Sequence, residues 1–351
     1  MMVNNLDERM PSPTLTARAA HARRELVVVL AVAALVLVVA TASLVVGSYT
    51  VSVPAVLKTL VGLGEPKDAF IVLQLRLPRV VVGILAGIAF ALAGAIFQAL
   101  LSNPLASPDI IGITGGASAA AVAALLVLGL GGIAVSAFAF AGALAVAAAI
   151  YALSWRSGIT GNRFVLVGIG FAFMVQGLLG YLLTRADVRD AQAALVWLVG
   201  SLSGVRWGDI LIFGIGLLVL VPTVATLAPK LRILQLGDPS ATGLGLPVSR
   251  TRLLLLLVAV ALAALGTAAV GPIAFVAFVS APIARRLTGT GGLALVPTAL
   301  VGILVVLVAD FVSQHALPGG VQVPAGIITG AIGAPYLLWL LATTNRSRGD
   351  A

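Results

Sequence analysis

The sequence lacks cysteine and contains few charged or aromatic residues. Of its 351 residues, 9% are charged, 6% are aromatic and two are histidines. The absence of cysteine excludes disulfides, thiol catalysis and cysteine-bound zinc or iron–sulfur centres. Two histidines are too few for a metal centre built from imidazoles, so we expect no metal site. Soluble domains carry about 25% charged residues, and the low charge therefore excludes an ordinary soluble fold.

Apolar residues and glycine dominate instead. Hydrophobic residues make up 60% of the chain, glycine contributes 39 residues, and the mean hydropathy is +1.15. The net charge of +9 would suit a nucleic-acid partner only if it formed a basic face on a folded domain. Here the basic residues are spread thinly between long apolar runs, which is typical of membrane-protein loops. We expect a multi-pass protein of the cell membrane, surrounded by lipid, with no nucleic-acid partner.

The gaps between charged residues predict the membrane spans, since a helix needs about 20 apolar residues to cross the bilayer. The charge-free intervals are 26–57, 80–108, 110–155, 164–184, 191–205, 210–229, 253–284, 287–309 and 311–345. Interval 110–155 holds two helices with a break near 129–132, and interval 253–284 is divided at Gly271-Pro272. Interval 191–205 is long enough only for a partial, re-entrant helix. The pattern predicts an all-α polytopic membrane protein with ten transmembrane helices plus short re-entrant or interfacial helices.

Ten spans place both ends of the chain on one side of the membrane. That side carries 14 of the 21 basic residues, and the opposite side carries Lys58, Lys67, Arg76, Arg79, Arg185, Arg189 and Arg206. By the positive-inside rule, the richer side is cytoplasmic. We therefore expect a disordered cytoplasmic tail at 1–25, a ten-span domain at 26–343 and a second cytoplasmic tail at 344–351.

Chemistry that would make this chain an enzyme is missing from the sequence. It contains no G-x-x-x-x-G-K-[ST] phosphate loop and offers no set of Ser, His and Asp for nucleophilic catalysis. Asp109 and Asp310 lie at the ends of spans, whereas ion-coupled carriers place acidic groups at mid-membrane. A secondary transporter is therefore the less favoured class, and a pathway driven by another protein is favoured.

Three breaks interrupt the apolar stretches, at 103–108, at Gly271-Pro272 and at 323–326. Non-helical backbone at membrane depth survives where it is buried in protein or lines a water-filled cavity. Each break has two interpretations, an ordinary loop or a cavity lining. Gly83 and Gly87 form a G-x-x-x-G face that predicts close helix packing.

Several motifs occur in a fixed order along residues 26–343. The first run is Leu75-Arg76-Leu77-Pro78-Arg79, then Gly83, Gly87, Gly94, Gln98, Asn103-Pro104-Leu105-Ala106-Ser107-Pro108, Gly112 and Gly115-Gly116-Ala117. The later matches are Leu236-Gly237-Asp238, Ala241, Leu244-Gly245, Gly271-Pro272-Ile273-Ala274-Phe275-Val276, Arg285, Ala309-Asp310, Pro324, Gly326, Gly333 and Pro335. Together they resemble the permease subunit of ABC importers for iron–siderophore complexes and vitamin B12, the FecCD type. The resemblance implies a type II ABC importer permease fold.

The resemblance also implies an assembly. A separate cytoplasmic ABC ATPase, in two copies, would bind ATP and Mg²⁺, so that this chain needs no cofactor and is not an enzyme. A second permease chain, identical or homologous, and an extracytoplasmic substrate-binding protein would complete the importer.

Site residues follow from the motif positions. Arg76 and Arg79 correspond to the family's external arginines, which meet acidic residues of the binding protein; simple interfacial anchoring is the alternative. A further family arginine is replaced by Gln314, which leaves the opposite docking contact open. The segment at about 230–252 corresponds to the loop that couples to the ATPase, with a helix on the membrane surface as the alternative. Its matching residues are Leu236, Gly237, Asp238, Ala241, Leu244 and Gly245.

The translocation pathway and its gates are expected at the remaining motif positions and breaks. These are Gln98, Asn103, Pro104, Gly112, Gly116, Gly271, Pro272, Phe275, Pro324 and Gly326. The family's Ala-Pro-His-Ile-Ala-Arg appears here as Ser280-Ala281-Pro282-Ile283-Ala284-Arg285, with the proline shifted and the histidine missing. This variant is most similar to the ferric enterobactin branch, so we expect a ferric catecholate siderophore. Vitamin B12, haem and other metal chelates are the alternatives.

Overall fold

The computed structural model describes residues 13–155, 161–315 and 322–349, and within them every regular element is helical. The first half contains α1 (Pro13–Val45), α2 (Val53–Leu60), α3 (Pro66–Ala69), the π-helical segment η1 (Phe70–Arg76), α4 (Leu77–Leu100), α5 (Ile113–Leu126), α6 (Ile133–Ser154) and α7 (Gly161–Arg185). The second half contains α8 (Val188–Val199), α9 (Trp207–Leu234), α10 (Asp238–Gly243), α11 (Val248–Val270), α12 (Val276–Thr288), α13 (Leu295–His315) and α14 (Ala325–Gly349).

Seven of the described helical segments are long and apolar enough to cross a membrane. They are Ala20–Val45, Pro66–Leu100, Ile133–Ser154, Arg163–Arg185, Trp207–Leu234, Val248–Val270 and Leu295–His315. Two shorter apolar helices, Ile113–Leu126 and Ala325–Trp339, and the 13-residue α12 fall in the other predicted spans. A 13-residue helix is too short to cross alone, and the number of ten spans stays a prediction.

The predicted breaks lie where the sequence places them. α5 and α6 are separated at residues 127–132, and α11 ends before Gly271. α8 is a short helix that overlaps the interval 191–205 and begins three residues before it. The predicted tails differ from the structure, because α1 begins at Pro13 and α14 continues to Gly349. Most of each predicted tail is therefore helical, while residues 1–12 and 350–351 lie outside the described residues.

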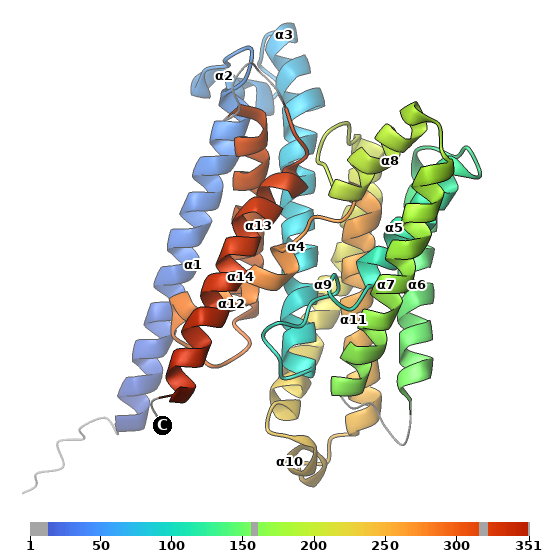
Figure 1. Ribbon diagram of the computed structural model, residues 1–351. Helices are drawn as coiled ribbons and strands as arrows, with labels where there is room; N and C mark the ends of the chain where they lie inside the picture. Colours follow the sequence, from blue (N-terminus) through green and yellow to red (C-terminus); the bar gives the residue numbers. More distant parts are fainter. Residues whose placement is uncertain (1–12, 156–160, 316–321, 350–351) are drawn as a thin grey trace, which may run out of the picture.

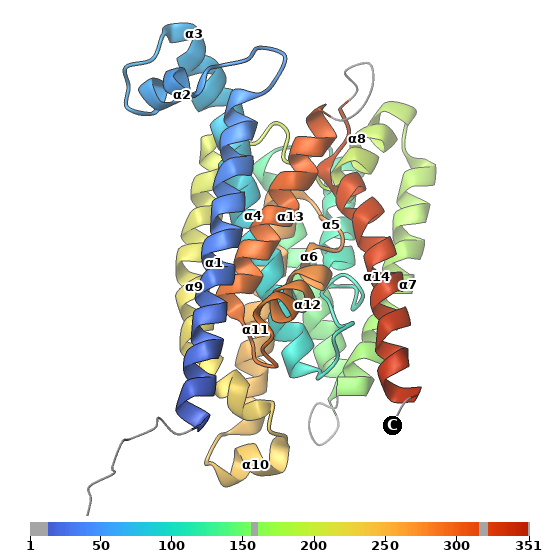
Figure 2. The same cartoon turned by 90° about the vertical axis from the view of Figure 1, so that its left-hand side faces the viewer.

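The long helices run roughly side by side, the short helices α2, α3, α8 and α10 lie at the two ends of the bundle, and the short α12 lies near its middle (Figures 1 and 2). α2, α3 and α8 lie at one end, which we call the cap end. α10 lies at the opposite end, together with the beginning of α1 and the end of α14. This grouping places the elements of the predicted cytoplasmic side together and those of the predicted external side together.

α4 forms the centre of the bundle. In the Pro66–Leu100 segment, 78% of the most apolar window is buried, against 17% in α7. Gly87 lies against the backbone of Ile303 in α13, and Gly94 lies against the carbonyl of Ala277 in α12. A side chain at either position would overlap with that backbone, so these glycines permit the close packing that the G-x-x-x-G pattern predicts.

Candidate functional site

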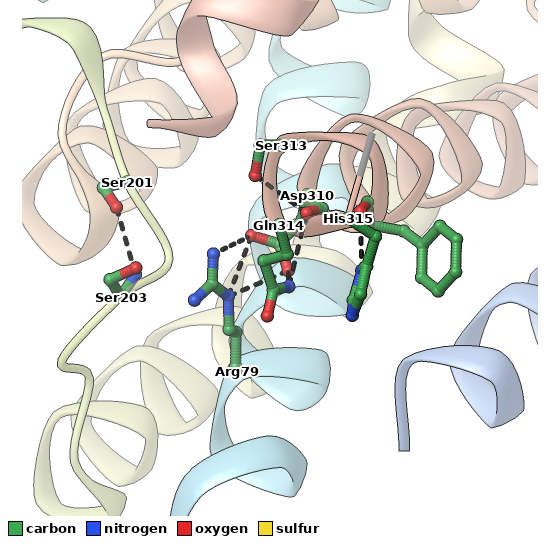
Figure 3. Close-up of polar contacts among 8 residues, drawn as sticks. Arg79, Ser201, Ser203, Asp310, Ser313, Gln314 and His315 are labelled. Carbon is green, nitrogen blue, oxygen red and sulfur yellow. Dashed lines mark hydrogen bonds and ion pairs between the residues drawn. The ribbon is translucent and has the colours of Figure 1, made fainter. Parts of the chain in front are cut away.

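A buried ion pair joins α4 to α13 near the cap end (Figure 3). Arg79 donates from Nε to both carboxylate oxygens of Asp310 at 2.9 Å, and from Nη2 to Oδ1 at 2.7 Å. The Asp310 side chain is 4% exposed and that of Arg79 is 16% exposed. A carboxylate this deeply buried needs a charged partner, and the fork of the guanidinium supplies it.

Gln314, one turn further along α13, completes the environment of Asp310. Its Nε2 donates to Asp310 Oδ2 at 2.8 Å, and Ser313 Oγ donates to the Asp310 main-chain carbonyl at 2.8 Å. Position 314 is where the resemblance expects an arginine. In this chain the glutamine contributes a neutral donor to the same carboxylate.

Arg76 lies at the end of η1 and binds the end of α1. Its guanidinium donates to the carbonyls of Leu44 at 2.7 Å and Val45 at 3.1 Å, and to the carbonyl of Tyr49. A cavity of about 580 Å³ opens beside Arg76, Arg79 and Gln314. Both arginines thus have partners within the chain, and docking of a binding protein on them stays a prediction.

The predicted coupling loop is an ordered turn at the end opposite the Arg79–Asp310 pair. α10 follows α9 after Gly237, and an ion pair of 2.8 Å links Asp238 to Arg252 of α11. Gly237 and Gly245, at φ of 91° and 79°, adopt the left-handed conformations that a glycine accepts readily. The turn is therefore joined to α11 by this ion pair, and its coupling to an ATPase stays a prediction.

The apolar side chains of the coupling loop differ in exposure: Ala241 is buried, whereas Leu236 and Leu244 are exposed. Ala241 is fully buried, in the same hydrophobic cluster as Leu231 and Leu234 of α9. The match to the coupling loop includes Ala241, and its burial gives it a supporting position within the chain rather than one on a contact surface. Leu236 is 63% exposed and Leu244 is 64% exposed, so these two leucines form the apolar surface of the loop.

Gln98, near the end of α4, forms hydrogen bonds with two residues of α12. Its Nε2 donates to the carbonyl of Phe278 at 3.0 Å, and its Oε1 accepts from Arg285 Nη2 at 2.8 Å. Arg285 lies 187 positions away, so local sequence does not indicate this contact. Gln98 is buried, and its hydrogen bonds are those of a packed structural amide.

The other predicted pathway residues lie in several places. Asn103 Oδ1 accepts from the Leu105 amide at 2.9 Å, which stabilises the turn that contains Pro104. Gly112, at φ 85°, begins α5 beside the backbone of Ala172 in α7. Gly116 lies against Gly142 in α6, so it serves helix packing.

Phe275 and the α11–α12 break form a separate group. Phe275 has a φ of 66°, which is rare for an aromatic residue, and it lines an apolar cavity of about 270 Å³ between α12, α13 and α14. Gly271, Pro272 and Gly326 come together at the end of α8, where they meet Gly200. The sequence pointed to the first three residues separately, and their common neighbour Gly200 was not among the predicted pathway residues.

These features define a class of protein. Long apolar helices packed through glycines, with a structured loop at one end and a buried ion pair near the other, are the architecture of a polytopic helical membrane protein. The FecCD transport family model matches residues 35–343. The chain belongs to the FecCD transport family, as the resemblance predicts, and it is a transport subunit rather than an enzyme.

Curated relatives cover nearly the whole chain. The chain is 40% identical over 328 residues to the Fe(3+)-citrate import system permease protein YfmE of Bacillus subtilis, covering 93% of this chain and 98% of YfmE. It is 42% identical over 311 residues to the achromobactin transport system permease protein CbrC of Dickeya dadantii, covering 88% of each. It is 35% identical over 302 residues to the ferric enterobactin transport system permease protein FepG of Escherichia coli, covering 86% of this chain and 91% of FepG.

A solved structure has the same architecture. An inward-facing conformation of a metal-chelate type ABC transporter superposes with a TM-score of 0.80 at 26% sequence identity, covering 90% of this chain and 98% of that one. The match supports the helical permease fold.

Proposed function

We propose that this chain is the permease of an ABC importer that carries an iron(III) chelate of the siderophore type into the cytoplasm. The observation that carries the proposal is the FecCD match over 35–343, together with relatives named for ferric citrate, achromobactin and ferric enterobactin. Two copies of a separate ATPase would supply the energy. A second permease chain and an extracytoplasmic binding protein would complete the assembly.

The positions of the two ends of the bundle support an orientation of the chain in the membrane. With the α10 end in the cytoplasm, as the positive-inside rule predicts, Leu236 and Leu244 face the ATPase. The cavity beside Arg76 and Arg79 then faces outward, toward the binding protein. Closure of the ATPase dimer would move α10, and the pathway would open to the other side by alternating access.

We propose a ferric catecholate, similar to ferric enterobactin, as the substrate. The support is the Ser280–Arg285 variant of the family motif, which follows Gly271–Phe275, and the 35% identity to FepG. A ferric citrate-like carboxylate complex is the second candidate, because YfmE is 40% identical over 93% of this chain. Both classes are anionic chelates, whereas the hydroxamate class is nearer neutral.

The test is growth of a host strain that lacks its own iron-chelate permeases and carries this gene with its ATPase and binding protein. Ferric enterobactin, ferric citrate and a ferric hydroxamate are each supplied as the only iron source. We expect rescue by ferric enterobactin and none with the Leu244→Asp variant. Rescue by ferric citrate alone would replace the catecholate by the carboxylate class. Rescue by none of the three, with vitamin B12 uptake instead, would contradict iron transport.

A further inference from the structure

We propose that Gly200, Gly271 and Gly326 are positioning residues for transport. They form one backbone contact, which we call the glycine junction, between the end of α8, the α11–α12 break and the start of α14. We infer that these three segments keep their contact and move as a unit during the transport cycle. This inference rests on the proposed transport function.

Main-chain hydrogen bonds connect the three segments directly. The Ser201 amide donates to the carbonyl of Val270 at 2.8 Å, which joins the second residue after α8 to the last residue of α11. The Gly326 amide donates to the carbonyl of Gly200 at 3.2 Å, which joins α14 to the same point. Figure 2 shows α8 beside the beginning of α14. Elements far apart in the sequence are thus joined by backbone hydrogen bonds.

Each glycine of the junction faces the backbone of another segment. A Cβ at Gly200 would lie 2.6 Å from the carbonyl oxygen of Pro272, and one at Gly271 would lie 2.6 Å from that of Trp197. A Cβ at Gly326 would overlap with the carbonyl oxygen of Val199. Real Cβ atoms do not approach backbone oxygens this closely. Any side chain would therefore force the segments apart.

The close backbone contacts make the junction rigid. All three glycines are buried. The segments are in direct backbone contact, so one segment cannot shift along another without a steric clash. α14 also packs against α13 and α12 further along its length. The junction is the buried backbone contact that places the first turn of α14 against the end of α8.

The chain provides matched controls for two of the glycines. Gly204 has a φ of 75°, nearly that of Gly200 at 79°, but a Cβ there would meet no atom within 4 Å. Gly330 lies one turn after Gly326 in α14 and also has open space. Alanine at the control positions introduces the same backbone or helix change without the clash.

The first experiment measures iron-chelate uptake and the unfolding temperature of the assembled importer with Gly326→Ala, Gly330→Ala, Gly200→Ala and Gly204→Ala. We expect Gly326→Ala and Gly200→Ala to lower both, with uptake reduced about ten-fold or more, while each control stays near the unchanged protein. Equal effects within each pair would overturn the junction. If the unchanged importer takes up no iron chelate, the proposed function fails, and the stability contrast still tests the contact.

The second experiment tests movement as a unit without disturbing the glycines. Because the chain has no cysteine, Val196→Cys in α8 and Ile327→Cys in α14 can be joined by a short reducible bis-thiol cross-linker. Both side chains are about half exposed. A gel band at monomer mass excludes links between chains, and the loss of both free thiols to a thiol-specific label identifies the link within one chain. We expect uptake to persist in the cross-linked importer. A loss of uptake that a reductant restores would show that the segments separate during transport, and would overturn the proposal.

Discussion

Arg79 and Asp310 are 231 positions apart and form a bidentate ion pair that is largely closed to solvent. The pair ties the beginning of α4 to the last turns of α13. A charge pair in this position is costly to break, because removing one member leaves the other buried without compensation. A measurement of stability can therefore test the structural role of this pair separately from a role in docking.

We predict that Arg79→Gln lowers the free energy of unfolding by about 3–5 kcal/mol, since Asp310 is left as an uncompensated buried charge. The double variant Arg79→Met/Asp310→Leu removes both charges and should recover much of this loss. Thermal unfolding of the purified protein in detergent measures both. Arg206→Gln is the control, because its ion pair with Asp209 is exposed and worth about 0–1 kcal/mol. An equal loss for Arg79→Gln and Arg206→Gln would contradict the assignment.

Gln314 tests whether the cavity beside Arg79 receives an acidic partner. Gln314→Arg adds a cation at the position of the family's arginine, and Gln314→Glu adds an anion. We expect the arginine variant to bind the binding protein more tightly and the glutamate variant more weakly, each by a few-fold, because partly exposed ion pairs contribute about 0–1 kcal/mol. Titration of the binding protein onto the permease in nanodiscs measures the affinity. Identical affinities for the two variants would place docking elsewhere.

Leu244→Asp should weaken capture of the ATPase. An unpaired carboxylate in an apolar contact costs about 2 kcal/mol or more, which corresponds to at least about a ten-fold loss of affinity. Co-purification of the ATPase with the tagged permease measures the effect, with equal membrane insertion as the first check.

The matched control for Leu244 is Leu63→Asp, because Leu63 is 76% exposed but lies between α2 and α3 at the cap end. It should retain full capture of the ATPase. Retained capture in the Leu244 variant, or equal loss in both, would exclude the α10 loop as the contact.

Gln98→Leu should reduce stability by about 1–3 kcal/mol, because Arg285 and the carbonyl of Phe278 each lose a hydrogen-bond partner inside the protein. Gln176→Leu, at an exposed position of α7, makes the same chemical change without burial and should have little effect. Thermal unfolding of the two variants is compared. Equal unfolding temperatures would show that the Gln98 contacts do not contribute.

The sequence predicts the helices and their breaks well, for a physical reason. Charges are excluded from the bilayer, and glycine and proline interrupt helices, so local residues alone indicate the short α8 and the break at Gly271. The helix α1 extends thirteen residues earlier than predicted, because 13–25 contains charges that end an apolar run without ending a helix.

Contacts between distant residues were beyond a reading of local sequence. Nothing near Arg79 identifies Asp310 as its partner, and nothing near Ala241 shows that α9 covers it. Gly271 and Gly326 are among the predicted pathway residues, yet their meeting at Gly200 depends on how α8, α11 and α14 are folded together. The local sequence pattern identifies the residues, and the tertiary structure shows which of them are in contact.

The burial of α4 determines which parts of the chain can move. Backbone contacts at Gly87 and Gly94 lock this helix to α13 and α12, so a shift of α4 alone would break the packing on several sides at once. α7, by contrast, has most of its surface outside the core. We therefore expect α4, α12 and α13 to keep their mutual contacts during transport, and larger displacements to occur in helices with more exposed surface, such as α7.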